Sequence, residues 1–264
     1  MRSCRGAAAS AWLEAKPGAT TTLGDTAFVL AGRHRLGLGA PTAVEAPPCP
    51  CAAGCAGTPD HAMLCKSVAS MTTMRHDIEA LAVRRVISRA GCASSMERTY
   101  RHLRSRGQHA GPEGQRRGDI LTVLPDGRVI IVDIVVTHPA APTYARAAAR
   151  TDGAAAERAA NQKRAEFRSF ADGAQYEFVP FAVESFGRLG QDAQRFISTL
   201  GDVAAASGRV SKSVFVMNAY KDLSCTLQRG NGLMYSRSLF NIARAEGRQF
   251  LPGSDVPLQD DAAL

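Results

Sequence analysis

The chain has 264 residues, of which 45% are apolar and 21% are charged. This length suits one domain with appendages or two small domains, and the composition excludes a fibrous or disordered class. No stretch approaches the run of about 18 apolar residues that a membrane-spanning helix needs, and the start lacks the apolar segment of a secretory signal. The net charge of +8 favours an acidic partner such as nucleic acid or a membrane surface. The alternative is an arginine-rich composition that serves no such partner.

The first half of the chain divides into four segments. Residues 1–48 form a mixed, linker-like lead-in, and residues 49–66 contain most of the cysteines. Over residues 74–90 the apolar positions recur at helical spacing, which predicts a helix that ends at Gly91. Residues 98–118 are rich in arginine, histidine and glycine. We expect that last segment to be a solvated loop.

Four of the seven cysteines lie within 17 residues, with one histidine among them. Without a secretory signal, such a cluster is more often a metal site than a disulfide framework. Cys49 and Cys51 form one close pair, and His61 and Cys65 share one face of a helical turn, as a tetrahedral zinc site requires. Cys55 is an alternative ligand. The alternative to zinc is a reduced loop with incidental cysteines.

The second half of the chain predicts strands and helices. The expected elements are two strands between residues 116 and 139, a helix over 154–171, a strand over 177–184, a helix over 187–200 and a partly helical region over 212–250. Residues 70–210 then form a core of the α/β (α+β) class. Residues 211–264 form a helical extension whose polar end frays.

The turn between the first two strands fixes which of their residues face each other. Its Pro-Asp-Gly sequence suits a three-residue hairpin loop, which pairs Leu124 with Arg128. In that register Asp119 lies opposite Asp133, on the same face of the sheet. Two carboxylates this close repel each other, and a bound Mg²⁺ would relieve the repulsion. The alternative is that Asp119 lies at a frayed strand end and Asp133 pairs with a buried arginine.

The helix over residues 154–171 carries one charged residue on its apolar face. Lys163 shares that face with alanines and phenylalanines. Such a lysine either extends outward to water or reaches an anion. Beside two metal-binding aspartates, its ammonium could polarise a phosphate and help to orient a water molecule. Two carboxylates, one ammonium and a divalent ion are what metal-assisted phosphodiester hydrolysis needs.

Basic residues near these motifs are candidates for contacts with nucleic acid. Arg116 and Arg117 directly precede Asp119 and could hold backbone phosphates, although a solvated run of charge is the alternative. Arg75 and His76, on the helix over residues 74–90, could also contact phosphate. For His76 the alternative is a buried histidine that bonds to a neighbouring loop.

Taken in order, these motifs resemble the C-terminal region of non-LTR retrotransposon polyproteins that carry a restriction-like endonuclease. The matching segments are AWLEAKP and FVLAGRHRLGLGAP in the lead-in, CPC with PDHAMLC, MRHDIEALAVRRVISRAG, RRGDI with DGRVIIVDIVVTHP, KRAEF, and FVPFAVESFGRLG. The resemblance covers about residues 11–205. It implies a PD-(D/E)xK fold, which is a restriction-endonuclease-like mixed β-sheet flanked by helices, preceded by a small zinc knuckle.

The resemblance also implies roles for individual residues. The residues that match the knuckle are implied zinc ligands, namely Cys49, Cys51, His61 and Cys65. Asp119 and Asp133 are implied to bind Mg²⁺ or Mn²⁺. Lys163 is implied to be catalytic. Glu97 matches an acidic position ahead of the first acidic strand. Two positions depart from the family pattern: Gly118 stands where proline is usual, and Ile134-Val135 follow Asp133 where a lysine is usual.

The expected function is therefore that of a metal-dependent DNA endonuclease, which cuts by attack of water on a phosphodiester. The sequence has no Tyr-x-Asp-Asp motif, so a reverse transcriptase encoded with or near it is an expected partner. The expected cofactors are Mg²⁺ (or Mn²⁺) and Zn²⁺, the substrate is DNA with RNA as an alternative, and the location is nuclear or otherwise intracellular. The alternative function is a catalytically decayed, zinc-dependent module that binds nucleic acid.

Overall fold

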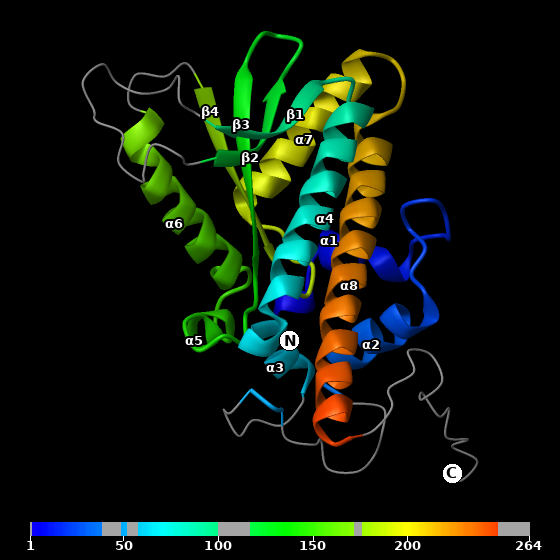
Figure 1. Cartoon of the computed structure of the whole chain (residues 1–264). Coiled ribbons are helices and arrows are strands. Elements are labelled where there is room, and N and C mark those ends of the chain that lie inside the picture. Colours follow the sequence, from blue (N-terminus) through cyan, green and yellow to red (C-terminus); the bar gives the residue numbers. More distant parts are fainter. Residues whose placement is uncertain (1, 39–48, 52–57, 100–116, 172–175, 248–264) are drawn as a thin grey trace.

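The computed structural model describes residues 2–38, 49–51, 58–99, 117–171 and 176–247 of the chain (Figure 1). It shows a mixed α/β protein with a four-stranded sheet flanked by helices. The strands are β1 (Ala93–Thr99), β2 (Arg117–Val123), β3 (Val129–Thr137) and β4 (Tyr176–Glu184). The helices are η1 (Arg2–Cys4), α1 (Ala7–Ser10), η2 (Ala11–Leu13), α2 (Asp25–Leu36), α3 (Pro59–Leu64), η3 (Lys66–Val68), α4 (Ala69–Arg89), α5 (Ala145–Ala148), α6 (Ala154–Ala171), α7 (Gln191–Ala206) and α8 (Lys212–Ala245). No described helix combines the length and the apolar character needed to cross a membrane.

The sheet is mixed and has the strand order β1-β2-β3-β4. The first three strands form an antiparallel meander, whereas β4 runs parallel to β3 after the crossover through α6. A parallel connection of this kind needs a crossover of a dozen or more residues, which α6 provides. β3 therefore has a partner strand on both sides, and its side chains are buried almost continuously because helices cover both faces of the sheet.

Helices cover both faces of the sheet (Figure 1). Alternate residues of β3 point to opposite faces. Ile130, Val132 and Ile134 join the main core with α4, α7 and α8. Ile131 instead packs against Phe167 of α6. We call the side of the sheet that α6 covers the α6 face. The odd-numbered residues of β3, including Asp133, point to this face.

The long helix α8 holds the molecule together. Its 34 residues span roughly 50 Å at 1.5 Å per residue, and it packs against α2, α3, α4 and α7. Asp222 of α8 is fully buried and forms ion pairs with Arg85 (2.8 Å) and Arg89 (2.9 Å) of α4. Further along, a Cβ atom at Gly230 would lie 2.7 Å from Cγ of Arg75, so glycine permits the close approach of the two helices.

The described part of the N-terminal segment, residues 2–38, is folded onto this body. Trp12, Ala31 and Cys225 make one buried cluster between η2, α2 and α8. Leu30 packs with Tyr235 of α8 in a second cluster, which also contains the cysteine region. The lead-in therefore contributes to the packing of α8, and α8 is itself part of the core.

The carboxyl group of Glu79 in α4 is buried, and we expect it to make the stability depend on pH in an unusual way. Neither of its carboxylate oxygens has a hydrogen bond within the described structure, and Ser224, which lines the same small cavity, also lacks one. Burial, reinforced by the charge of Asp222, raises the pKa of Glu79 to about 8. Between pH 4.5 and 8 the unfolded chain therefore binds fewer protons than the folded one, so the free energy of unfolding falls as pH rises.

We expect Glu79→Gln to remove this decrease in the free energy of unfolding at higher pH. The variant and the wild type should be similarly stable at pH 5, whereas at pH 8 the variant should be more stable by about 3 kcal/mol, because the amide carries no charge to bury. Urea unfolding at the two pH values measures this difference. Parallel pH profiles for the two proteins would contradict the assignment.

Candidate functional site

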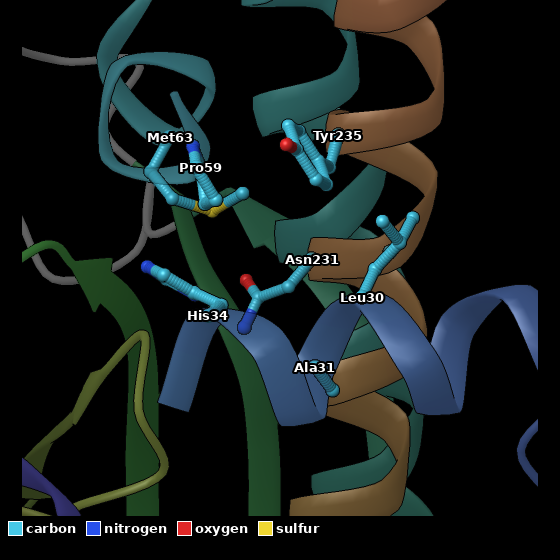
Figure 2. Close-up of a pocket in the computed structure, with 8 residues that line it drawn as sticks. Leu30, Ala31, His34, Pro59, Met63, Asn231 and Tyr235 are labelled. Carbon is cyan, nitrogen blue, oxygen red and sulfur yellow. The ribbon is translucent and has the colours of Figure 1, made fainter. Parts of the chain in front are cut away.

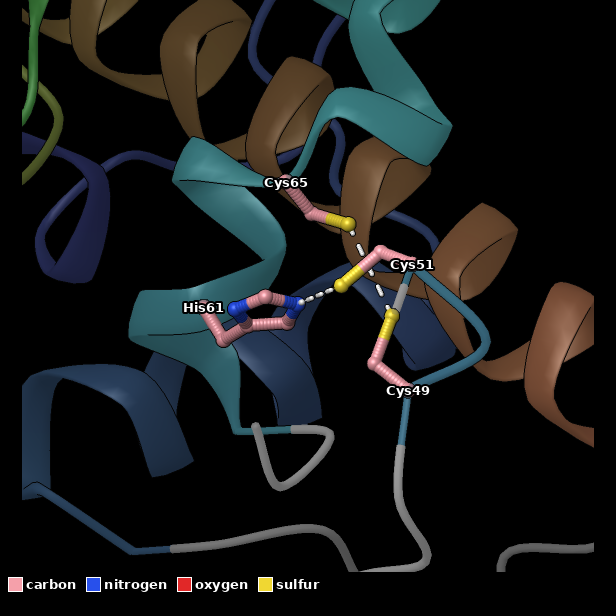
Figure 3. A group of neighbouring side chains, drawn as sticks. All are labelled: Cys49, Cys51, His61 and Cys65. Carbon is pink, nitrogen blue, oxygen red and sulfur yellow. Dashed lines mark hydrogen bonds between the residues drawn. The ribbon is translucent and has the colours of Figure 1, made fainter. Parts of the chain in front are cut away.

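The structure brings the predicted zinc ligands together in a Cys3His cluster that could hold a metal ion such as zinc (Figure 3). Sγ of Cys49 lies 3.6 Å from Sγ of Cys65, and Sγ of Cys51 lies 3.4 Å from Nε2 of His61. A disulfide would need about 2.05 Å between sulfur atoms. With bonds of about 2.3 Å to sulfur and 2.0 Å to nitrogen, neighbouring ligands of a tetrahedral zinc ion lie roughly 3.5–3.8 Å apart. The observed separations therefore suit zinc.

A short helix sets the positions of His61 and Cys65. Thr58 caps α3, since its Oγ1 accepts a hydrogen bond from the backbone N–H of His61 at 3.1 Å. Pro59 follows at the first helical position, where its missing N–H costs nothing. His61 then lies in the first turn, and Cys65 directly follows the last residue of α3. Cys55, the alternative ligand, lies outside the described residues.

The cysteines of the cluster differ in their acidity. Burial and the neighbouring thiols raise the pKa of Cys49 to about 11. Burial alone would also raise the pKa of Cys65, but hydrogen bonds with Ser67 outweigh it and lower that pKa; Oγ of Ser67 lies 3.0 Å from Sγ. A zinc ion binds thiolates, so its binding would release protons from these groups.

The second candidate site begins with the hairpin between β2 and β3. The backbone N–H of Leu124 donates to the carbonyl of Arg128 at 2.9 Å, and Gly127 has a φ of +87°. This is the predicted three-residue turn with glycine in the left-handed region. The register pairs Ile120 with Val132, so Asp119 and Asp133 are next in line across the two strands. The paired residues end at Ile120 and Val132, and Asp119 accepts a hydrogen bond from the backbone N–H of Ile134, so the shared face of the two aspartates stays a prediction.

Asp133 is buried on the α6 face and meets Lys163. Its side chain is 6% exposed, and Nζ of Lys163 lies 2.8 Å from its Oδ2 atom. Burial raises the pKa of Asp133 and the charge of Asp119 adds to that effect, while Lys163 opposes both. Burial would lower the pKa of Lys163, but the hydrogen bond and charge of Asp133 raise it overall. The lysine on the apolar face of α6 has therefore reached an anion.

Asp119 links β2 to both β3 and α4. Its Oδ2 atom accepts a hydrogen bond from the backbone N–H of Ile134 at 2.6 Å and lies 3.1 Å from Nε2 of His76. The hydrogen bond to Asp119 raises the pKa of His76 to about 9, and Asp77 on the other ring nitrogen contributes. The imidazole is therefore cationic at neutral pH. His76 and Lys163 place one positive charge beside each carboxylate.

Replacing Lys163 with methionine should destabilise the protein, because it leaves the Asp133 carboxylate buried without its partner. We expect the free energy of unfolding to fall by roughly 1–3 kcal/mol, less than for a fully buried pair since Lys163 is partly exposed. The added change Asp133→Asn should recover part of the loss. Urea unfolding of the two single variants and the double variant measures the coupling.

A matched control is the exposed ion pair between Lys212 and Asp202, which also has a separation of 2.8 Å. Lys212→Met should cost at most about 0.5 kcal/mol, because solvent screens that pair. If both lysine variants lose the same free energy of unfolding, the burial of Asp133 does not explain the contribution of Lys163 to stability.

Of the residues predicted to contact nucleic acid, Arg75 requires a correction. Its side chain is buried, and it donates a hydrogen bond to Oδ1 of Asn231 at 2.9 Å. In the sequence Arg75 is next to His76, and nothing in the pattern shows that its side chain faces α8. A buried guanidinium that is bonded to Asn231 cannot reach a phosphate of a bound nucleic acid. Arg116 and the side chain of Arg117 lie outside the described residues, as does the side chain of Glu97.

Comparisons with known proteins add no relative. No family model matches the sequence, and no curated protein matches it. The structure itself defines a mixed α/β protein with helices on both faces of its sheet and a Cys3His cluster suited to a metal ion.

Proposed function

We propose that the chain is a metal-dependent DNA endonuclease, which nicks or cleaves DNA by attack of water on a phosphodiester. The observation that carries this proposal is the group formed by Asp119, Asp133 and Lys163. The two aspartates lie next to the last residue pair of β2 and β3, Ile120 with Val132, and the charge of Asp119 acts on Asp133. Nζ of Lys163 lies 2.8 Å from Oδ2 of Asp133. Paired carboxylates beside an ammonium group are the components of metal-assisted phosphodiester hydrolysis.

The two carboxylates are suited to a hard cation such as Mg²⁺ or Mn²⁺. Their oxygen atoms are the ligand type that such ions prefer, and the contacts described above use only the Oδ2 atoms. Bound to Asp119 and Asp133, a divalent ion would supply Lewis acidity toward the phosphate and a more acidic water. In this proposal the ammonium of Lys163 holds a phosphate oxygen, and the burial of Asp133 limits access of bulk water.

His76 has a positioning role in the proposal. Its cationic ring lies against Asp119, and the N–H of Ile134 lies against the same oxygen. Together they fix the direction of this carboxylate relative to Asp133. The phosphate contacts proposed for DNA binding are those of Arg116 and Arg117, with the net charge of +8 as a general attraction.

One observation favours the alternative function of a nucleic-acid-binding module that has lost catalysis. Both carboxylates already have a cationic side chain against them, His76 at Asp119 and Lys163 at Asp133. If these ion pairs outcompete a divalent ion, no metal binds there. The Cys3His cluster and the positive charge would then serve binding alone. RNA, DNA and a separate reverse transcriptase are partners that either function allows.

Supercoiled plasmid distinguishes the two functions. The purified chain is incubated with plasmid in Mg²⁺, Mn²⁺ or Ca²⁺, and the products are separated by electrophoresis. The endonuclease should yield relaxed or linear DNA with Mg²⁺ or Mn²⁺, whereas Ca²⁺ should support binding with little cleavage. Retarded plasmid without any relaxed product in all three ions would leave only the binding module.

A further inference from the structure

We propose that His34, Asp60 and His138 form a second metal site, which takes a divalent ion of the zinc type. The three residues come from separate elements: the last turn of α2, the first turn of α3 and the position directly after β3. This site goes beyond the proposed nuclease function and does not depend on it. It would join the N-terminal segment and the zinc-knuckle helix to the central sheet.

The ligand atoms of this site converge on one point. Oδ1 of Asp60 lies 3.0 Å from Nε2 of His34 and 3.2 Å from Nε2 of His138, and the three residues offer ligand atoms within 4.8 Å of one another. In a tetrahedral zinc site with bonds of about 2.0–2.1 Å, neighbouring ligand atoms lie roughly 3.3–3.4 Å apart. Two imidazoles and one carboxylate are a common zinc donor set, with the fourth position open.

The ring of His138 is buried and directs one nitrogen at Asp60. Its side chain is 1% exposed, and Nε2 lies 3.2 Å from Oδ1 of Asp60 in an ion-pair contact that lacks hydrogen-bond geometry within the described structure. The other ring nitrogen, Nδ1, lies 2.7 Å from Oγ of Ser185. If Nδ1 donates to that hydroxyl, Nε2 carries a lone pair directed at the carboxylate of Asp60, and two acceptors face each other. A cation bound between them would satisfy both.

The two histidines are enclosed by packed side chains, whereas the carboxylate of Asp60 is exposed to solvent. Phe186 packs against the ring of His34 with the centroids 4.4 Å apart, and the amide of Asn231 donates to the carbonyl of Ser185 at 2.7 Å. Figure 2 shows His34 and Asn231 beside Pro59 around a small pocket between α2, α3 and α8. The side chain of Asp60 is 56% exposed, so an ion could enter from solvent at its carboxylate.

This site is separate from the other two candidate sites. Asp60 and His61 are adjacent on α3, but their side chains contact different groups, since His61 meets Cys51. His138 follows Asp133 by five residues along β3, which is roughly 16 Å at 3.3 Å per residue. The ion at His34, Asp60 and His138 therefore has neither thiolate ligands nor the carboxylates of the proposed nuclease site.

Metal analysis of the full chain tests the proposal. After dialysis against metal-depleted buffer, we expect the wild type to keep two zinc ions per chain. Asp60→Asn and His138→Gln should each keep one, and the exposed-site control Asp202→Asn should keep two. Asp60→Asn is the gentler variant, because its half-exposed amide can still bond to both histidines. An equal zinc content in the wild type and Asp60→Asn would overturn the proposal.

Cobalt substitution identifies which ion is lost. Only the Cys3His cluster gives sulfur-to-cobalt charge-transfer bands, so Asp60→Asn should retain these bands while binding one cobalt fewer. Cys65→Ser should lose them and still bind one cobalt. Loss of the thiolate bands in Asp60→Asn would show that the variant disturbs the knuckle, and the second site would then be rejected.

Discussion

Asp133→Asn should reduce plasmid nicking in Mg²⁺ by at least roughly 10²–10³-fold, the usual loss when a charge essential to the transition state is removed. Asparagine keeps the shape of the side chain and its contact with Lys163, but it removes the charge that would hold the cation. Because Lys163 is partly exposed, water can solvate its ammonium while the contact persists, so the fold should be retained. The measurement is the initial rate of conversion of supercoiled to relaxed plasmid.

Asp126→Asn is the matched control for that experiment. Asp126 lies in the turn of the same hairpin and bonds only to Arg128 at the surface among the contacts of the described residues. Its replacement should leave the rate within about twofold of wild type. Affinity for plasmid in Ca²⁺ should be similar for all three proteins, since phosphate contacts supply most of it. Unchanged nicking by Asp133→Asn would refute the nuclease site and point to a contaminating enzyme.

The elements around the proposed nuclease site could be predicted because local chemistry determines them. The turn sequence at Pro125-Asp126-Gly127 sets the register of β2 and β3, which the structure shows from the pair Val123 and Val129 to the pair Ile120 and Val132. The helix predicted over 154–171 has the same bounds as α6, because its alanines and phenylalanines recur at helical spacing. Lys163 could be placed on the buried face by the same periodicity.

Other elements depend on packing that no local pattern shows. β1 was not predicted, since Ser94 and Ser95 give no apolar alternation and the strand forms by pairing with β2. The region of α8 was expected to be helical only in part, and Gly230 and Gly232 do disfavour a helix. In the structure these glycines let α8 approach α4 and α2 closely. The loss of helix propensity is offset by packing between helices.

The same distinction applies to the two candidate metal sites with histidine ligands. Four ligands within 17 residues and the spacing of His61 and Cys65 made the Cys3His cluster predictable. His34 and His138 are separated by more than a hundred residues, and Asp60 lies in the segment PDHAMLC beside His61. Only the packing of α2 and α3 against the end of β3 brings these three together. A sequence pattern carries no signal for such a group.

Cys65→Ser should remove one zinc ion per chain and lower the free energy of unfolding by about 3–5 kcal/mol, or roughly 10 °C in melting temperature. Cys65 is buried in a cluster with Val68 and Met234. A metal bound to the Cys3His cluster would link the segment of Cys49 and Cys51 to the region where α3 packs on α8. Without it, that segment has little apolar surface to hold it there. Metal analysis and thermal unfolding measure the two effects.

Cys225→Ser provides the control for burial alone. Cys225 is fully buried in a different cluster, with Trp12 and Ala31, and it is not among the grouped metal ligands of the described residues. Its replacement should cost about 1–3 kcal/mol for the buried hydroxyl and leave the zinc content unchanged. A strong chelator should bring the wild type close to the stability of Cys65→Ser. If Cys65→Ser instead keeps the wild-type zinc content, Cys65 is not a zinc ligand and the predicted ligand set is wrong.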